Sequence, residues 1–258
     1  MTSPSKRVVI VGGASGIGET CCHVMAQAGW SVVVGDLDLQ AATRVAAACD
    51  GTAMRIDVGD DASVETAAEQ IERDLGPVDA LVVTAATFQE ALSPEKLPME
   101  TWDRIVRINF RGTYIVNVAF GKRMALRGRG SIVNTSSITA MRASPVHVYG
   151  PVKAALNCMS ENLAAEWGRS GVRVNVVSPG TVPVERVKAR LASGARYAGR
   201  IEDHTALGRL ASVEEVAQTI EFLASDKSSG ITGANIVVDA GMLLVPSWHM
   251  FGGVPGPR

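Results

Sequence analysis

The 258-residue chain lacks the features that mark membrane, nucleic-acid-binding and secreted proteins. Its formal net charge is -1, with 25 basic and 26 acidic residues interspersed, so it carries neither a nucleic-acid footprint nor a polybasic membrane patch. No apolar stretch approaches membrane-spanning length, and residues 1–6 lack the hydrophobic region of a signal peptide. We therefore expect a cytoplasmic protein that binds neither nucleic acid nor a membrane.

Side chains that bind metals are also scarce. The four cysteines show no Cys-x-x-Cys spacing, and the four histidines form no ligand cluster. Three of the cysteines lie in helical patterns among small apolar residues, where a free thiol behaves as a small hydrophobic side chain. We therefore expect neither a metal site nor a disulfide.

Apolar residues and glycine, in contrast, are abundant. With 47% apolar side chains, 26 glycines and no linker of biased composition, residues 1–258 fit a single α/β domain with a substantial core. Short apolar runs predict strands at 7–11, 32–34, 53–56, 80–84, 131–134 and 172–177. Helical patterns lie between them, at 17–28, 62–75, 101–127, 149–169 and 213–223. This alternation predicts a doubly wound parallel sheet, the Rossmann-type fold.

The first two predicted strands and the helix between them form one βαβ unit. The segment Gly12-Gly13-Ala14-Ser15-Gly16-Ile17-Gly18 follows the first strand at once, and the second strand ends at Asp36. Glycine lets the backbone approach a pyrophosphate closely and leaves the N-terminus of the helix open to it. An acid at the tip of the second strand can accept hydrogen bonds from both hydroxyls of an adenosine ribose. The unit therefore predicts a dinucleotide site.

A second motif lies far downstream, where Tyr149 and Lys153 stand four residues apart. On a helix their side chains share one face. A phenol titrates near ~10 in water, and a cation a few ångströms away lowers that pKa, so the tyrosine can act as general base for an alcohol proton. The pair alone is a common surface accident, and the glycine-rich turn is what favours chemistry here.

Pro151 lies between these two residues and constrains the helix. A proline in a helix interior costs ~3 kcal/mol or more, but it costs little in the first turn, where the backbone N–H groups have no intrahelical partner. We therefore predict that this helix begins at or just before Tyr149.

Together the motifs resemble the short-chain dehydrogenase/reductase family. The spacing Gly12-x-x-x-Gly16-x-Gly18 is looser than the common Gly-x-Gly-x-x-Gly fingerprint and, with the distant tyrosine and lysine, is typical of that family. Further matching segments are Asp57-Val58, Asn109, Asn175 to Gly180 and the closing stretch from Gly208 to Gly241. The resemblance extends from about Lys6 to Gly241.

The resemblance implies a catalytic set and a cofactor site. Tyr149 would act as the general base or acid, and Lys153 would lower its pKa and hold the nicotinamide ribose. A serine hydroxyl would bond the reacting oxygen, and Asn109 would fix a water that links Lys153 to solvent, unless it is only a structural amide that bends its helix. The implied cofactor-binding residues are Gly12, Ser15, Gly16, Ile17, Gly18, Asp36, Leu37, Asp57, Val58, Ala85, Tyr149, Lys153, Pro179, Gly180 and Val182.

Which serine contacts the substrate oxygen is left open by the spacing. Counting forward from the strand selects Ser137, whereas counting back from Tyr149 selects Ser136. Loops absorb deletions more readily than strands do, so we choose Ser137.

The chain departs from the family pattern at two places. Val83-Thr84-Ala85-Ala86 stands where the family has Asn-Asn-Ala-Gly, and Val11 stands where a threonine is usual. Thr84 could replace the missing amides in part, so we expect altered stability more than lost activity.

Asp36 also indicates which cofactor is bound. A carboxylate at this position would repel the 2′-phosphate of NADP, and neither Ser15 nor Leu37 could neutralise that phosphate. We therefore expect NAD. The alternative is a structural Asp36 that only caps the following helix.

Two further segments are assigned from their position. Residues 183–206 would form a flap over the substrate, either a carboxylate-recognising lid or a solvated helix pair, and carry Arg186, Lys188, Arg190, Arg196, Leu191 and Tyr197. The tail, residues 242–258, is apolar and should pack against another surface. Because relatives commonly form tetramers through this region, we predict a homotetramer.

The predicted function is an NAD-dependent transfer of hydride between a nicotinamide cofactor and a secondary alcohol or ketone. The alternatives are an NADP-dependent carbonyl reductase and a noncatalytic NAD(H)-binding regulator on the same fold. A sensor would not need a base, so the retained serine, tyrosine, lysine and asparagine favour an enzyme. Substrate identity is barely encoded, and the expected pocket residues are Thr87, Thr139, Met141 and His147.

Overall fold

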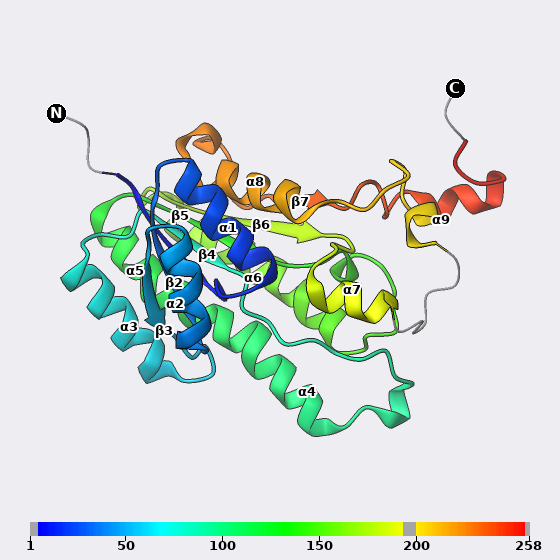
Figure 1. Cartoon of the computed structure of the whole chain (residues 1–258), viewed down its shortest axis with the longest axis horizontal. Coiled ribbons are helices and arrows are strands. Elements are labelled where there is room, and N and C mark those ends of the chain that lie inside the picture. Colours follow the sequence, from blue (N-terminus) through cyan, green and yellow to red (C-terminus); the bar gives the residue numbers. More distant parts are fainter. Residues whose placement is uncertain (1–4, 193–199, 256–258) are drawn as a thin grey trace.

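The predicted alternation of strands and helices forms one parallel sheet, which Figure 1 shows in the computed structural model. The structure describes residues 5–192 and 200–255. Its strands are β1 (Arg7–Val11), β2 (Ser31–Asp36), β3 (Thr52–Arg55), β4 (Ala80–Val83), β5 (Gly130–Thr135), β6 (Val172–Pro179) and β7 (Asn235–Val238). They lie in the order β3-β2-β1-β4-β5-β6-β7, and every neighbouring pair is parallel. The predicted doubly wound fold is confirmed.

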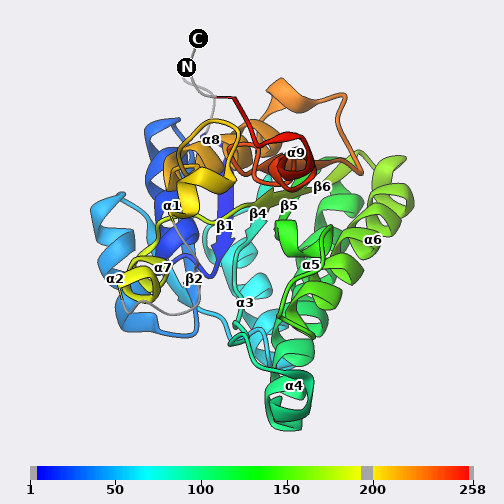
Figure 2. The same ribbon diagram turned by 90° about the vertical axis from the view of Figure 1, so that its right-hand side faces the viewer.

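Helices cover both faces of this sheet (Figure 2). One face carries α1 (Gly16–Gln27), α2 (Leu39–Ala48) and α8 (Val213–Ala224), and the other carries α3 (Asp61–Asp74), α5 (Thr113–Arg127) and α6 (Tyr149–Gly168). The shorter helices are α4 (Met99–Ile105), α7 (Glu185–Ala192) and α9 (Val245–Trp248). Within the described residues, no helix is both long and apolar enough to cross a membrane.

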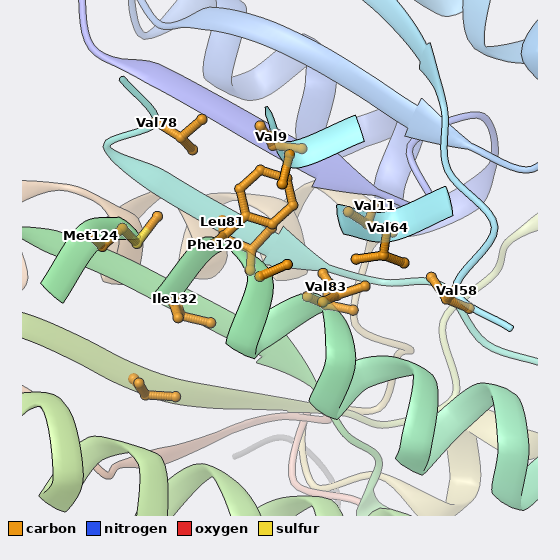
Figure 3. Packing of buried hydrophobic residues seen from close by; sticks show 14 of the residues in the cluster. Val9, Val11, Val58, Val64, Val78, Leu81, Val83, Phe120, Met124 and Ile132 are labelled. Carbon is orange, nitrogen blue, oxygen red and sulfur yellow. The ribbon is translucent and has the colours of Figure 1, made fainter. Parts of the chain in front are cut away.

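The core is divided by the sheet into two layers because successive side chains of a strand point to opposite faces. Val9 and Val11 of β1 pack into the layer under α3, α5 and α6, whereas Val8 and Ile10 pack under α1, α2 and α8. In the first layer the ring of Phe120, on α5, lies against the sheet near Val9 and Leu81 (Figure 3). Strands buried on both faces explain the continuous apolar runs in the sequence.

The predicted helix over 101–127 is interrupted. Between α4 and α5, Val106–Gly112 forms a π-helical segment, η2, which contains Asn109. The hydroxyl of Thr113 donates to the backbone carbonyl of Asn109 at 2.9 Å, which satisfies an oxygen near the register change. Such bulges occur frequently at functional sites.

The fold brings the predicted motifs to one edge of the sheet, where the strands have their carboxyl ends. The chain reverses its direction of travel across the sheet between β1 and β4, and open α/β sheets bind ligands outside the carboxyl ends at such a switch point. The loops after β1, β4 and β5 all meet there, and they carry the predicted motifs.

Candidate active site

The turn after β1 is packed too tightly for side chains at two of its glycines. Gly12 has a φ of +88°, and a Cβ there would lie 2.4 Å from the backbone nitrogen of Ala85. A Cβ on Gly18 would lie 2.0 Å from the carbonyl oxygen of Gly12. The hydroxyl of Thr84 donates to the carbonyls of Val11 and Gly12 at 3.1 and 3.0 Å. Thr84 thus braces this turn, as expected for a partial replacement of the missing amides.

The N-terminus of α1 lies open at the end of this turn. Ser15 is its N-cap, but the serine side chain makes no capping hydrogen bond and the residue is exposed. The positive end of a helix, where the first N–H groups have no intrahelical acceptor, can bind a phosphate. The turn and helix therefore fit a dinucleotide pyrophosphate.

Asp36 points its carboxylate at the same turn. Its Oδ2 accepts from the backbone N–H of Ala14 at 3.1 Å, and its Oδ1 accepts from that of Asp38 at 3.1 Å. The cap of α2 is supplied by Asp38, whose Oδ1 accepts from Ala41 at 3.0 Å. The alternative in which Asp36 caps this helix is therefore wrong.

The other predicted cofactor residues lie along the same edge of the sheet. Asp57 and Val58 follow β3, and the Asp57 carboxylate accepts from the backbone N–H of Gly59 at 2.9 Å. Ala85 donates its N–H to the Val11 carbonyl at 2.9 Å. Pro179 ends β6, Gly180 and Val182 follow it, and Val182 is buried. Ile17 is half-buried in the first turn of α1, and Leu37 is exposed beside Asp36.

Tyr149 is the first residue of α6, and Pro151 lies in the first turn, as predicted. Lys153 follows one turn later on the same face. Its ammonium nitrogen lies 5.7 Å from the centroid of the Tyr149 ring. The sequence therefore predicted the start of this helix and the proximity of the two side chains correctly.

The Lys153 ammonium is buried at a place without an acid. The side chain is 3% exposed, and Nζ donates to the backbone carbonyl of Thr135 at 2.6 Å. Within the described part of the chain no ion pair involves it. Burial lowers the pKa of Lys153 to about 8. A buried cation with a perturbed pKa beside a phenol marks a candidate catalytic site.

The two candidate serines differ in what their hydroxyls do. The Ser136 hydroxyl is buried and donates to the Lys153 backbone carbonyl at 3.1 Å. The Ser137 hydroxyl is half-buried and accepts from the N–H and the hydroxyl of Thr139 at 3.2 and 3.0 Å. Because those two contacts use only acceptor capacity, the Ser137 proton can still be donated to another oxygen.

Asn109 holds the loop that follows β4. Its Oδ1 accepts from the N–H of Thr87 at 2.7 Å, and its Nδ2 donates to the Thr87 carbonyl at 2.8 Å. The residue is fully buried within η2. Its side chain therefore has the bracing role of a structural amide, and the water-fixing role stays a prediction.

Two residues next to Tyr149 escaped the sequence analysis. The ring of Phe88 lies 5.5 Å from the Tyr149 ring, centroid to centroid. The side chain of Gln89 accepts hydrogen bonds from the backbone of Val148 and Tyr149. Both come from the loop after β4, some sixty residues earlier, and neither belongs to a periodic pattern or a motif.

Of the other expected pocket residues, Thr87 and Thr139 take part in the contacts above, and Met141 and His147 are half-buried. The predicted flap is described only in part. Its α7 begins beside the glycine-rich turn, where the Val184 side chain would lie 3.4 Å from a Cβ on Gly16. Lys188 pairs with Glu185 at 2.7 Å on the surface. Arg196, Tyr197 and the side chains of Arg186, Arg190 and Leu191 lie outside the described residues.

The tail leaves several apolar side chains exposed. Met250 and Phe251 are 82% and 78% exposed, and Figure 1 shows this end of the chain projecting beyond the sheet. A hollow of about 700 Å³ lies between α8, β7 and the start of the tail, away from Tyr149. Phe222, Val237 and Leu244 line it.

Comparison with known proteins agrees with this geometry. A family model described as enoyl-(acyl carrier protein) reductase matches residues 12–243. D-threitol dehydrogenase of Mycolicibacterium smegmatis is 36% identical, with 92% of each chain covered. Galactitol 2-dehydrogenase of Rhizobium johnstonii is 33% identical, with 92% of this chain and 94% of that protein covered.

Two solved structures are similar over nearly the whole chain. A crystal structure described as ribose-5-phosphate isomerase from Brucella melitensis 16M is 43% identical, with a TM-score of 0.95 and 98% of each chain covered. A structure described as ElxO with NADP bound is 26% identical, with a TM-score of 0.86 and 93% and 99% covered. The fold and site define a nicotinamide-dependent type of oxidoreductase. The chain belongs to the short-chain dehydrogenase/reductase family.

Proposed function

We propose that the protein is an NAD-dependent dehydrogenase that interconverts a secondary alcohol and a ketone, with Tyr149 as the general base or acid. The observation that carries this proposal is the buried Lys153 ammonium beside the Tyr149 ring, at the same sheet edge as the glycine-rich turn. A noncatalytic dinucleotide sensor would need the turn and Asp36 but would gain nothing from a buried cation next to a phenol.

The residues divide the chemistry between them. In the oxidation direction, the Tyr149 phenolate takes the hydroxyl proton of the alcohol, while the carbon loses hydride and its bond to oxygen becomes a carbonyl. A bound nicotinamide supplies the hydride acceptor. Lys153 favours the ionised phenol by its charge, and its place four residues after Tyr149 on α6 keeps the two groups one turn apart. A positioned base of this kind contributes ~10²–10⁴ in rate.

Ser137 supplies the second contact to the reacting oxygen in this proposal. Its hydroxyl accepts from Thr139 and still has a proton to donate, whereas the Ser136 hydroxyl already donates its proton to the Lys153 carbonyl. A donor fixed where negative charge develops on an oxygen stabilises the transition state without reorganising.

The choice of NAD rests on Asp36. Its carboxylate is held at the glycine-rich turn by Ala14, where the adenosine ribose of a bound dinucleotide would lie. The 2′-phosphate of NADP would meet that negative charge. Neither of its neighbours, exposed Leu37 and Ser15, carries a positive charge that could neutralise the phosphate. NADP, the cofactor named for ElxO, is the rival to test.

The substrate class is proposed from the relatives and the site together. Threitol and galactitol are polyols. The loop after β5 offers the hydroxyls of Ser137 and Thr139, and the ring of Phe88 packs against that of Tyr149. A small polyol or hydroxyketone would find both polar and apolar contacts there. A sugar-phosphate isomerase is the second candidate, since the protein of 43% identity is described as one, but isomerisation would leave Asp36 and the turn without a use.

The experiment is steady-state turnover of a panel of polyols with NAD and with NADP, beside Tyr149→Phe. We expect turnover with NAD, and a fall of ~10²-fold or more in kcat for the variant, because the phenylalanine keeps the ring but removes the base. Undiminished turnover by the variant would reject the mechanism. Isomerisation of ribose 5-phosphate in the absence of any dinucleotide would favour the second candidate.

The proposal also includes a homotetramer in the cytoplasm. The exposed apolar tail and the hollow lined by Phe222, Val237 and Leu244 fit a second copy of the chain. The cysteines are free, and Cys21 and Cys22 are buried, which suits a reducing compartment. Light scattering that gave a monomer for the full chain would contradict this assembly.

A further inference from the structure

The N-terminus of α6 is capped by a side chain from a distant loop. Gln89 is 4% exposed, and its Oε1 accepts from the backbone N–H groups of Val148 at 2.9 Å and Tyr149 at 3.2 Å. The helix has no local cap, because its N-cap residue is the apolar Val148, which makes no side-chain hydrogen bond. The first N–H groups of a helix need such an acceptor when they are buried.

The loop that carries Gln89 is itself held at a second point. Two residues earlier, the backbone of Thr87 is clamped by both amide atoms of Asn109. Between them, the ring of Phe88 packs against the Tyr149 ring. One short segment therefore joins the π-helical turn at Asn109 to both the backbone and the ring of Tyr149.

The orientation of the Gln89 amide is fixed, and it leaves a buried donor unused. Nε2 cannot take the place of Oε1, because it would direct donors at two donors. Among the described residues Nε2 has no hydrogen-bond partner, although it is buried. An apolar side chain of similar length would avoid this cost but could not accept from the helix. The role of the Gln89 amide is therefore to accept the two hydrogen bonds at the start of α6.

We propose that Gln89 is a positioning residue for Tyr149, which it holds at the start of α6 without opposing ionisation of the phenol. This inference rests on the proposed function. A carboxylate would accept from the same N–H groups and suit the positive end of the helix. It would also place a negative charge next to Phe88, whose ring packs against that of Tyr149, and this charge would disfavour the phenolate. A neutral acceptor satisfies both requirements.

Two variants separate the two parts of this role. Gln89→Met removes the acceptor with little change in length, and Gln89→Glu keeps an acceptor but adds a charge. Glu90→Gln is the matched control, because it changes the charge of the exposed neighbouring residue by one unit in the opposite sense. The measurements are kcat and KM for NAD and substrate, the pH profile of kcat/KM, and hydrogen exchange of the amides of Val148 and Tyr149.

For Gln89→Met we expect kcat to fall by about tenfold or more, with KM for NAD within about twofold, because a small displacement of a catalytic group is costly. Amide exchange at residues 148 and 149 should become faster. For Gln89→Glu we expect slow exchange to return, kcat to recover at high pH, and the apparent pKa of alcohol oxidation to lie about one pH unit higher. Glu90→Gln should change neither kcat nor the profile.

Three results would overturn the inference. The first is a Gln89→Met enzyme with parental kcat and amide exchange. The second is a parallel loss of NAD affinity and thermal stability, which is what a general structural role predicts. The third is a Gln89→Glu profile identical to the parent. If Tyr149→Phe retains turnover, the proposed function fails instead, and the exchange data still report on the cap by themselves.

Discussion

The two edges of the sheet use basic side chains in opposite ways. At the carboxyl edge, the buried Lys153 ammonium donates to a backbone carbonyl and lies beside a phenol ring. At the amino edge, a hollow of about 1030 Å³ is lined by several cations, among them Lys6, Arg129 and Arg173. Size and charge alone would make the amino edge the more attractive binding site.

The amino-edge cations, however, have structural partners. Lys6 pairs with Asp226, and Arg129 lies 3.5 Å from Asp79. The guanidinium of Arg173 donates to the hydroxyl of Ser228 and to the carbonyls of residues 225 and 231. The C-termini of α3, α5, α6 and α8 all end at this edge, and cations there stabilise the helix ends. The comparison teaches that the proposed site is distinguished by a buried charge that forms no ion pair within the described residues, and not by the size of a hollow.

The largest effect that would test this contrast is expected from Lys153→Met. Turnover should fall by ~10²–10⁴ because the phenol loses the charge that favours its ionised form. The free energy of unfolding, in contrast, should rise. Burial lowers the pKa of Lys153 to about 8. Below that pH the folded chain contains a buried charge that destabilises it, and the neutral methionine removes this cost.

The sign of the pH dependence follows from that pKa. Between about pH 8 and the ordinary lysine pKa, the unfolded chain binds more protons than the folded one, so the parental free energy of unfolding rises with pH. At pH 7 and without cofactor, removal of the buried charge should stabilise the variant by up to ~3 kcal/mol. Loss of the hydrogen bond to Thr135 should offset ~1 kcal/mol of that gain. The advantage should shrink towards pH 10. Urea unfolding that gave a pH-independent difference would contradict this account.

A smaller effect on turnover is expected at Asp36, whose charge should decide between NAD and NADP. In Asp36→Asn, one oxygen can still accept at the glycine-rich turn, but the negative charge is gone. We expect the ratio of kcat/KM for NAD to that for NADP to fall by ~10²-fold, the equivalent of about 3 kcal/mol. Asp38→Asn, at the cap of α2, is the control and should leave the ratio unchanged. A parent without preference for NAD would refute the role of Asp36.

The sequence predicted the features of the site that are local along the chain. Strand 7–11, the glycine-rich turn and the helix start at Tyr149 each depend on residues within a few positions of one another, so periodicity and the chemistry of glycine and proline sufficed. The spacing of Tyr149 and Lys153 likewise needed only the helical repeat.

The remainder depends on contacts between distant segments. Gln89 caps a helix some sixty residues later, and Asn109 clamps Thr87, but single polar residues outside a pattern reveal no partner. The π-helical break at Val106–Gly112 was missed because the apolar repeat continues through it. The two counts left Ser136 and Ser137 in competition, and the hydrogen bond from the Ser136 hydroxyl to the Lys153 carbonyl, a contact between distant segments, was not predictable from either count.

The smallest effect on turnover is expected from the amino edge, at Arg127. Its guanidinium pairs with Glu72 at 2.6 Å and donates to the Val78 carbonyl at 2.7 Å, with both charged side chains largely buried. Arg127→Met should lower the free energy of unfolding by ~2–4 kcal/mol, because a buried carboxylate and a carbonyl lose their donor. Well below the melting temperature, kcat should stay within about twofold of the parent.

The matched control for Arg127 is an ion pair on the exposed surface. Arg111 and Asp61 form two hydrogen bonds of 2.7 Å, yet more than half of each side chain is exposed. Arg111→Met should therefore leave the urea midpoint of unfolding close to that of the parent. If Arg127→Met instead abolished turnover while the protein stayed folded by circular dichroism, cations at the amino edge would serve the chemistry as well, and the contrast between the two edges would be lost.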